Sequence, residues 1–198
     1  MVRKPYAPAC DRNRDPILNA LRVHFADRAR VLEIGSGTGQ HAVYFAQALQ
    51  HLWQTSDCAE NLPGIRLWIE DANVPSTPPP LELDVNADQW PRTRFDAVFS
   101  ANTLHIMSWA EVERMFSGLA GVMTADAKLT IYGPFNYGGR FTSQSNAAFD
   151  ASLKAQSPHM GIRNFEAVDA LAQNIGLDLV EDAAMPANNR CLVWRRSR

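Results

Sequence analysis

The sequence predicts an α/β protein whose core is an open, mainly parallel β-sheet with helices packed on both faces. Strand-like apolar runs alternate along the chain with longer runs of helical spacing, which is typical of this class. One strand-like run, residues 31–34, leads into a glycine-rich turn and then directly into a helix-compatible run at residues 42–49. The last two strand-like runs, at residues 177–181 and 191–195, are joined by a short turn and predict an antiparallel hairpin.

The composition is that of an ordinary globular protein and predicts one domain over residues 1–198. Hydrophobic residues make up 46% and charged residues 20% of the chain, and the net charge of −2 gives no field for polyanions, so we expect no nucleic-acid partner. The cysteines, Cys10, Cys58 and Cys191, are too few and scattered to indicate a disulfide framework or a metal site. Without a recognisable signal peptide or bilayer-spanning run, we expect a cytoplasmic protein with no membrane partner; the oligomeric state stays open.

The first element is predicted as a helix at about residues 11–26. Asp15 suits the N-cap position, and Pro16 suits the first helical position. Apolar residues then follow with helical spacing at Ile17, Leu18, Leu21 and Phe25. Because this helix precedes the first strand, we expect it to pack on the sheet or to cover the ligand-binding edge.

Three alternate glycines, Gly35, Gly37 and Gly39, follow the first strand and form the most informative motif of the chain. Glycine permits positive φ and a close approach of the backbone to a ligand, and the N–H groups at the start of the next helix face that ligand. A dinucleotide-binding turn needs a glycine at the position of Gln40, and a phosphate-binding loop needs a lysine that this turn lacks. Glu33 completes the pattern acidic-x-Gly-x-Gly-x-Gly.

The second strand is predicted at residues 51–55, with Asp57 directly after it. An acid at this place reaches the ribose hydroxyls of a nucleoside in open α/β sheets, which makes Asp57 the leading ribose ligand and Glu60 its reserve. Asp57 is also suited to cap the next helix, predicted at residues 60–72, and the two roles are compatible.

The rest of the parallel sheet is predicted from three further apolar runs. The third strand lies at residues 81–85 and ends near Asp84, the fourth lies at 94–102 and the fifth at 127–132. A helix with one apolar face is predicted at residues 109–119. The carboxyl end of the fourth strand is therefore expected to border the bound ligand.

The segment at about residues 135–160 interrupts the sheet and is predicted as a substrate-covering insertion. It contains Gly138-Gly139 and several aromatic side chains: Phe135, Tyr137, Phe141 and Phe149. Loops with several aromatics commonly close over a ligand, although a purely structural role is the alternative. A helix at residues 164–174, ended by Gly176, then leads into the terminal hairpin.

The pattern from Glu33 to Gly39 resembles motif I of the class I S-adenosylmethionine (SAM)-dependent methyltransferases. The Phe-Asp-Ala-Val-Phe run of the predicted fourth strand is similar to the fourth strand of the same superfamily. This resemblance implies a three-layer, Rossmann-like sheet of seven strands that ends in an antiparallel C-terminal hairpin. It also implies SAM as the cofactor and S-adenosyl-L-homocysteine (SAH) as its product.

Nearly the whole chain resembles one family of small methyltransferase-like proteins, long catalogued as a domain of unknown function. The matching stretches are residues 12–17, 32–43, 56–57 with 60–62, 99–107, 132–136, 139–143 and 185–190. After Ser-Asp the family pattern has another acid, and this chain has Cys58-Ala59 instead. The family carries no agreed substrate, so the resemblance implies SAM binding and leaves the acceptor open.

The glycine turn, the strand ends and the N-terminal helix supply the residues that we expect to bind SAM. In methyltransferases the acid at the end of the third strand commonly contacts the adenine amino group, which suggests this role for Asp84; a surface aspartate is the alternative. Arg12 and Asn13 lie where a lid over the methionine carboxylate would begin, unless they only serve the helix start. The predicted set is Arg12, Asn13, Glu33, Gly35, Ser36, Gly37, Thr38, Gly39, Asp57, Asp84, Val85, Ala101 and Asn102.

Three residues are candidates for the chemistry: His105, Asn102 and Arg140. His105 follows the fourth strand, and an imidazole titrates near neutrality, so it is the natural base; a packed structural histidine is the alternative. Arg140 could hold an acidic acceptor bidentately or form a salt bridge within its loop. Asn102 stands at the end of the fourth strand, where the methyl group is expected.

The sequence therefore predicts a SAM-dependent methyltransferase that acts by in-line transfer on a small-molecule acceptor. The Asn-Pro-Pro-Tyr type of motif that grips planar amino groups is absent, and no cysteine follows a proline, as cytosine methylation commonly requires. Two alternatives stay open. One is a SAM- or SAH-binding module without turnover, and the other is a different nucleotide-dependent enzyme on the same scaffold.

Overall fold

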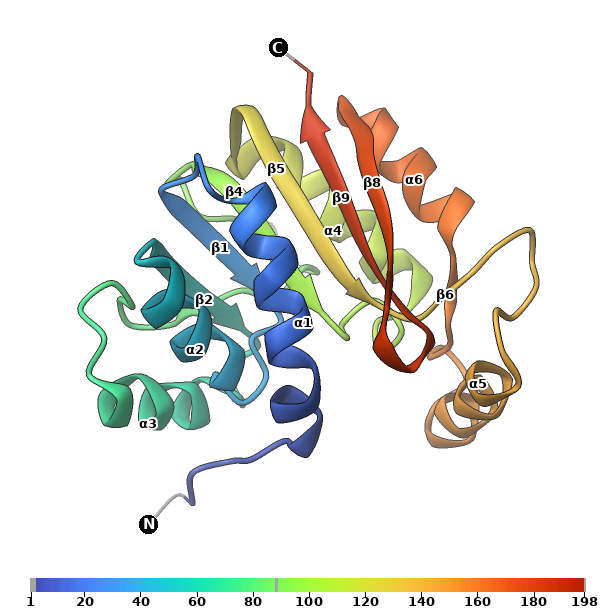
Figure 1. The fold of residues 1–198 in the computed structure, drawn as a ribbon, viewed down its shortest axis with the longest axis horizontal. Helices are drawn as coiled ribbons and strands as arrows, with labels where there is room; N and C mark the ends of the chain where they lie inside the picture. Colours follow the sequence, from blue (N-terminus) through green and yellow to red (C-terminus); the bar gives the residue numbers. More distant parts are fainter. Residues whose placement is uncertain (1–2, 88, 198) are drawn as a thin grey trace.

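The computed structural model describes residues 3–87 and 89–197 and contains a seven-stranded β-sheet between layers of helices (Figure 1). In chain order the elements are α1 (Pro8–His24), β1 (Arg30–Ile34), α2 (Gln40–Leu49), β2 (Leu52–Asp57), α3 (Leu62–Ala72), β3 (Leu81–Glu82), β4 (Phe95–Ala101), α4 (Trp109–Val122), β5 (Met123–Gly133), β6 (Phe135–Asn136), α5 (Gln144–Gln156), β7 (Arg163–Asn164), α6 (Phe165–Asn174), β8 (Leu177–Met185), a 3₁₀ turn (Pro186–Asn188) and β9 (Asn189–Arg196). The sheet order is β3-β2-β1-β4-β5-β9-β8; β1 to β5 run parallel, and β9 is antiparallel to both of its neighbours. The predicted α/β class, seven strands and terminal hairpin are thereby confirmed.

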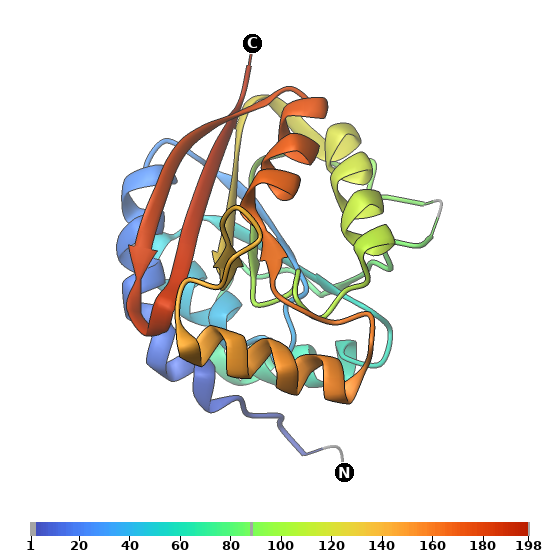
Figure 2. The ribbon, with the colours of Figure 1, turned by 90° about the vertical axis from the view of Figure 1, so that its right-hand side faces the viewer.

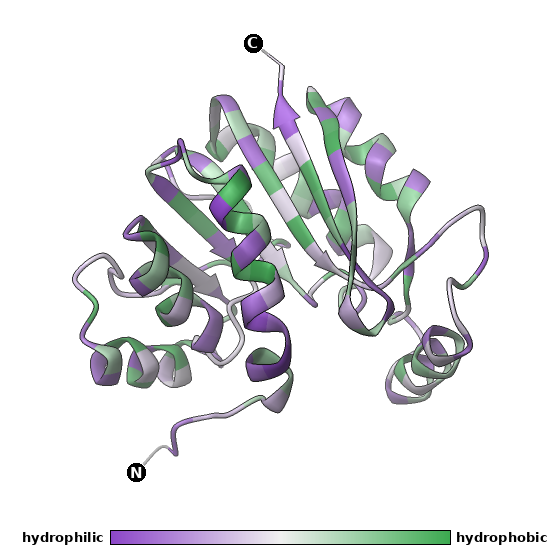
Figure 3. Ribbon diagram, viewed as in Figure 1, coloured by the Kyte–Doolittle hydropathy of each residue, from purple (hydrophilic) through white to green (hydrophobic). Residues whose placement is uncertain are grey.

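Helices cover both faces of this sheet. α1 and α2 pack on one face and α4 and α6 on the other, while α5 runs below the edge at which the parallel strands end (Figure 2). Successive residues of a strand are therefore buried on alternate sides: Val31 packs with α1 and α2, and Leu32 packs with α4. Hydrophobic residues accordingly recur along the strands (Figure 3). In the part of the chain that the structure describes, no helix combines the length and apolar character needed to cross a membrane.

The N-terminal helix differs from the prediction at both ends. The predicted helix at about 11–26 is present, but α1 spans Pro8–His24, so it starts and ends earlier than predicted, and the prediction of Asp15 as the N-cap is wrong. Ala7 takes the N-cap position with an extended backbone, and Pro8 is the first helical residue. Proline is well suited to this position, because the N–H that it lacks would have no partner within the helix. Pro16 lies inside the helix and removes one backbone hydrogen bond, but buried apolar side chains hold the second half of α1 on the sheet.

The lengths of several strands also differ from the prediction. The third strand covers only Leu81–Glu82 of the predicted 81–85, because it lies at the edge of the sheet and pairs with the last two residues of β2. The fifth strand, Met123–Gly133, is longer than the predicted 127–132. It lies between β4 and β9; at the two ends of the added length Met123 pairs with Phe95 of β4 and Gly133 with Arg190 of β9, and the register with β4 is irregular between Met123 and Lys128.

The segment at 135–160, predicted as a loop-like insertion, contains the short strand β6 and the helix α5. Ser143 caps α5, since its Oγ accepts a hydrogen bond from the N–H of Asn146 at 3.1 Å. The sequence does not predict this helix, because its buried face includes the polar residues Asn146 and Asp150 and the apolar period is lost. Asp150 accepts from the N–H of Ile162 at 2.8 Å, which fixes α5 on the chain that follows it.

Two glycines of α4 provide a matched test of the packing around this helix. A Cβ added at Gly118 would lie 1.9 Å from the ring of Trp90, whereas one added at Gly121 would meet nothing within 4 Å. We expect Gly118→Ala to lower the free energy of unfolding by about 1–3 kcal/mol, because the ring must move. Gly121→Ala should raise it by about 0.5–1 kcal/mol through helix propensity. Urea unfolding measures both values, and equal effects would contradict the packing described.

Candidate functional site

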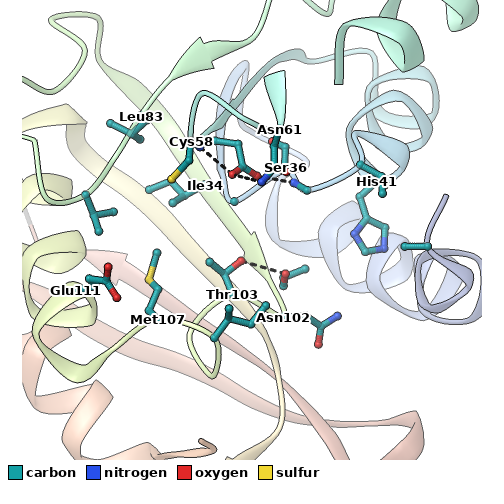
Figure 4. A pocket seen from close by; sticks show the side chains of 18 of the residues that line it. Ile34, Ser36, His41, Cys58, Asn61, Leu83, Asn102, Thr103, Met107 and Glu111 are labelled. Carbon is teal, nitrogen blue, oxygen red and sulfur yellow. Dashed lines mark hydrogen bonds between the residues drawn. The ribbon is translucent and has the colours of Figure 1, made fainter. Parts of the chain in front are cut away.

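A cavity of about 550 Å³ opens at the carboxyl ends of β1, β2 and β4 (Figure 4). Its walls come from the glycine turn, the chain after β2, the chain after β3, the chain between β4 and α4, the start of α1 and the chain after α5. The volume lies in the range of cavities that hold small organic ligands. Nine of the predicted site residues line it: Gly35, Ser36, Gly37, Thr38, Asp57, Asp84, Val85, Ala101 and Asn102.

The glycine turn is held in place by backbone hydrogen bonds to β2. The N–H groups of Gly35 and Ser36 donate to the carbonyl of Ser56 at 3.1 and 3.0 Å. Gly37 has a φ of +56°, and a Cβ added there would meet no protein atom within 4 Å. The space beside Gly37 is therefore open to a ligand, as expected of an alternate-glycine turn. Gly39, also predicted to bind the cofactor, is the N-cap of α2 and lies outside the lining set.

Asp57 joins the turn to the end of β2. Its Oδ2 accepts from the N–H of Gly37 at 2.7 Å, and its Oδ1 accepts from the N–H of Cys58 and the side-chain amide of Asn61, both at 2.8 Å. A carboxylate accepts about four hydrogen bonds, so one position stays available for a ligand in the cavity. The structure does not support the alternative role as a helix cap, because α3 begins at Leu62 with Asn61 at the N-cap position.

Glu33 lies beneath the turn, is 2% exposed and does not line the cavity. Its Oε2 accepts from the hydroxyl of Ser36 at 2.9 Å and from the indole N–H of Trp53 at 3.1 Å. Burial raises the pKa of Glu33 to about 7; the two hydrogen bonds oppose this shift, and the charge of Asp57 adds to it. Glu33 thus supports the turn from inside the protein instead of facing the ligand.

The N-terminal region lines the cavity with residues other than those predicted. Small residues at the start of α1 form the wall: Ala7, Ala9 and Cys10. Arg12 is exposed and lies outside the lining set. Asn13 is buried, and its side-chain oxygen lies 2.7 Å from Nε2 of His41, so it ties α1 to α2. The sequence suggests polar residues as contacts for a ligand at the start of α1. The small side chains that line the cavity there have no sequence pattern that would indicate binding.

Of the three predicted catalytic residues, Asn102 is the one that lines the cavity. It follows β4 directly and has a φ of +57°, which is uncommon outside glycine. His105 is 6% exposed and lies outside the lining set; burial and, second, the charge of Arg163 lower its pKa to about 4. Arg140 is exposed and does not line the cavity. It lies in a turn that is closed by backbone hydrogen bonds between Arg140 and Tyr137.

Two residues after α5, His159 and Met160, also line the cavity, which the sequence does not indicate. Arg163 holds this stretch against the chain that follows β4. Its guanidinium donates to three carbonyl oxygens: those of Leu104 at 3.0 Å, of Met107 and of His159 at 2.9 Å. Such bonds to backbone carbonyls have no sequence signature. Within residues 3–87 and 89–197, no three His, Cys, Asp or Glu side chains are grouped so that they could hold a metal ion.

Solved structures share this fold over most of the chain. An O-methyltransferase family protein from Burkholderia thailandensis is similar with a TM-score of 0.82 at 17% identity, over 92% of this chain and 56% of that chain. Human N-acetylserotonin methyltransferase, solved in complex with SAM, gives 0.81 at 13% identity, over 96% and 53%. Magnesium protoporphyrin IX methyltransferase from Synechocystis PCC 6803, with bound SAH, gives 0.72 at 16% identity, over 93% and 82%. The chain spans about half the length of the first two proteins.

The topology and these similarities define a class I SAM-dependent methyltransferase-like fold. Sequence comparison then identifies a narrower group. The family described as "Protein of unknown function (DUF938)" matches residues 4–196, which is nearly the whole chain. The chain belongs to this family, and the predicted resemblance to a methyltransferase-like family of unknown function is confirmed.

The buried acid beneath the turn makes the stability of the fold depend on pH. The pKa of Glu33 is raised from the ordinary value of 4.5 to about 7, so the folded protein holds the proton more tightly than the unfolded chain. The stability linked to this group is complete below pH 4.5 and is lost as the pH rises through 7. As the pH rises over this interval, the free energy of unfolding of wild type should fall by about 3 kcal/mol relative to that of Glu33→Gln, since each pKa unit corresponds to about 1.4 kcal/mol.

Urea unfolding of wild type and Glu33→Gln at a series of pH values measures this difference. Subtracting the two curves removes the contribution of other buried groups, such as His41, whose pKa burial lowers to about 4. Parallel curves for the two proteins would show that Glu33 titrates normally and that its burial beneath the turn is misassigned.

Proposed function

We propose that the protein is a SAM-dependent methyltransferase that transfers a methyl group to a small-molecule acceptor. The observation that carries this proposal is the meeting of three groups at one cavity: the open backbone at Gly37, the carboxylate of Asp57 and the acid Asp84. They lie at or just after the carboxyl ends of three neighbouring strands of the sheet, β1, β2 and β3. In this proposal the amino-acid part of SAM lies beside Gly37, its ribose contacts Asp57, and its adenine lies beside Asp84.

The residues present fit this cofactor. Asp57 keeps one acceptor position for a ribose hydroxyl after its three protein hydrogen bonds. The open space beside Gly37 lies before the N-terminus of α2, which favours a carboxylate such as that of methionine. Asp84 and Val85 border the part of the cavity that we assign to the adenine. When bound, SAM supplies a methyl group activated by a positively charged sulfur.

The task of the protein in methyl transfer is to align the acceptor and to exclude water. Asn102 offers an amide at the end of β4, and the hydrogen bond from its N–H to the carbonyl of Tyr132 (2.8 Å) holds its strained backbone. A pKa of about 4 makes His105 a poor proton acceptor at neutral pH. We therefore assign acceptor positioning to Asn102, proton acceptance to His159 at the cavity wall, and packing to His105.

A nicotinamide-dependent enzyme on the same scaffold is disfavoured by the contacts of Gln40. Its side-chain oxygen accepts from the N–H of Ala7 at 2.6 Å and from the hydroxyl of Thr38 at 3.0 Å. The position at which a dinucleotide turn needs glycine is thus filled by a side chain that fixes the start of α1. A binding module without turnover would share the SAM site, so binding and turnover need separate measurements.

Isothermal titration calorimetry with SAM, SAH and NAD tests the cofactor, and SAH release over fractionated metabolite pools tests turnover. We expect SAM and SAH to bind, NAD not to bind, and at least one pool to release SAH. Absence of any affinity for SAM would overturn the proposal. Binding without SAH release from any pool would identify a binding module instead.

Asp57→Ala removes the carboxylate that joins the turn to β2. We expect it to weaken SAH binding by about 10–100-fold, because a hydrogen bond to a charged group contributes about 1.5–3 kcal/mol. Calorimetry measures the affinity, and the melting temperature of the apoprotein reports any loosening of the turn. Glu70→Ala removes an exposed carboxylate from α3 and should leave SAH binding unchanged. Equal weakening in both variants would contradict the ribose assignment.

Gly37→Ala and Gly139→Ala form a second matched pair. Both glycines have positive φ, +56° and +73°, and a Cβ added at either would meet no protein atom within 4 Å. Backbone strain of about 1–2 kcal/mol is therefore common to the two variants. Gly37 alone lines the cavity, so we expect its substitution to weaken SAH binding by about 10-fold or more. Calorimetry decides between this result and an equal loss in both variants, which would mean that strain alone acts.

A further inference from the structure

We infer, on the basis of the proposed function, that the acceptor is a small molecule with a positive charge and no anionic group. The charged side chains around the cavity are dominated by carboxylates: Asp57, Glu60, Asp84 and Glu111. No lysine or arginine is among the lining residues of the described chain. Of the two lining histidines, His41 is kept neutral by burial, which lowers its pKa to about 4; His159 is exposed and lies near enough to Glu111 for its charge to lower the pKa of that carboxyl.

Glu111, in the first turn of α4, places a fixed negative charge on the cavity wall (Figure 4). Its Oε1 accepts from the side-chain amide of Asn86 at 3.0 Å, and its Oε2 accepts from the N–H of Ser108 at 2.6 Å. The bond from Asn86 and then that from Ser108 lower the pKa of Glu111, so its carboxylate is ionised at neutral pH.

Arg163, Arg12 and Arg140 do not offer a partner for an anion in the cavity. Arg163 lies behind the wall, and its guanidinium donates to three backbone carbonyls. Arg12 and Arg140 are exposed and outside the lining set. The geometry therefore does not support the expectation that Arg140 holds an acidic acceptor. The carboxylates of the cavity favour a positively charged acceptor instead.

The cofactor does not reverse this field. SAM carries a carboxylate, an ammonium group and a sulfonium, hence one net positive charge, against the four carboxylates of the wall. The occupied cavity stays negative overall. Each carboxylate within about 8 Å changes the affinity for a charged ligand about five-fold at an effective dielectric constant of about 40. A cation gains from this field, and an anion is repelled.

The uncharged part of the acceptor would face apolar side chains. Ile106, Met107 and Met160 line the cavity between the chain after β4 and the chain after α5. Arg163 joins these two stretches through their carbonyls, so the wall is fixed. Ile106 is 48% exposed, and an apolar ligand would cover it. The acceptor class that fits both features is an amine on a compact apolar skeleton, bound as its ammonium ion. Its nitrogen must give up a proton, to His159 under the proposed function, before its lone pair can take the methyl group.

Matched probes on SAH-loaded protein test the charge preference. The compounds 2-phenylethylamine, 2-phenylethanol and 3-phenylpropionate share one skeleton and differ in charge, and ligand-observed NMR titration gives their dissociation constants. We expect the amine to bind about 10-fold or more tightly than the carboxylate, with the alcohol between them and the ratio falling as salt is added. Equal or tighter binding of the carboxylate overturns the inference, as does absence of binding by all three.

Glu111→Gln removes one charge and keeps the capping box, because glutamine serves equally at the third helical position. The affinity for the amine should fall about five-fold and that for the carboxylate should rise about five-fold, so the ratio of the two falls about 25-fold. Glu113→Gln removes a carboxylate from an exposed position of the same helix and should leave the ratio unchanged. An unchanged ratio in Glu111→Gln, or an equal fall in both variants, overturns the inference.

Failure of the proposed function is distinguished by measuring SAH binding first, without any probe. If SAH does not bind, the cofactor assignment fails. The three probes are then titrated against the unliganded protein, and the ratio of amine to carboxylate affinity decides the charge preference as before.

Discussion

The hydrogen bond from the N–H of Gly37 to the carboxylate of Asp57 is the contact on which the site depends. It ties the turn after β1 to the end of β2, two strands that pair in parallel. A turn with positive φ at Gly35 and Gly37 exposes N–H groups that need partners to keep a defined shape. Asp57 supplies such a partner and still keeps one acceptor position for a ligand. The shape of the turn and its capacity to bind are therefore set by the same carboxylate.

The fold and half of the site could be predicted because their signals are local. The glycines, Asp57 and Asp84 stand at strand ends, and the carboxyl ends of neighbouring parallel strands meet at one edge. The other half carries no local signal. α5 buries Asn146 and Asp150, which hides its amphipathic period, and Arg163 binds backbone carbonyls, which every sequence contains. These contacts exist only once the tertiary structure has formed.

His105 and His159 illustrate the same limit. His105 is close to β4 in sequence, yet it packs edge-on against Phe149 and its burial lowers the pKa to about 4. His159 is remote in sequence and reaches the cavity because Arg163 holds its backbone against the chain after β4. Its Nδ1 lies 2.9 Å from the hydroxyl of Ser157, which orients the ring. The environment of a histidine, more than its place after a strand, decides what it can do.

The two halves of the cavity are built in different ways, and under the proposed function this separates binding of the cofactor from choice of the acceptor. The first half rests on strand ends and backbone of the central sheet. The second is lined by the chain after β4 and by His159 and Met160 after α5. α5 itself is tied to the terminal hairpin by Asn146, whose amide donates to the carbonyl of Asn188 at 3.1 Å, and to the following chain by Asp150. Segments of this kind can change without disturbing the sheet. Solved methyltransferases share the sheet at 13–17% identity. The properties that distinguish this chain are therefore to be sought in side chains such as Glu111 and His159, outside the glycine turn.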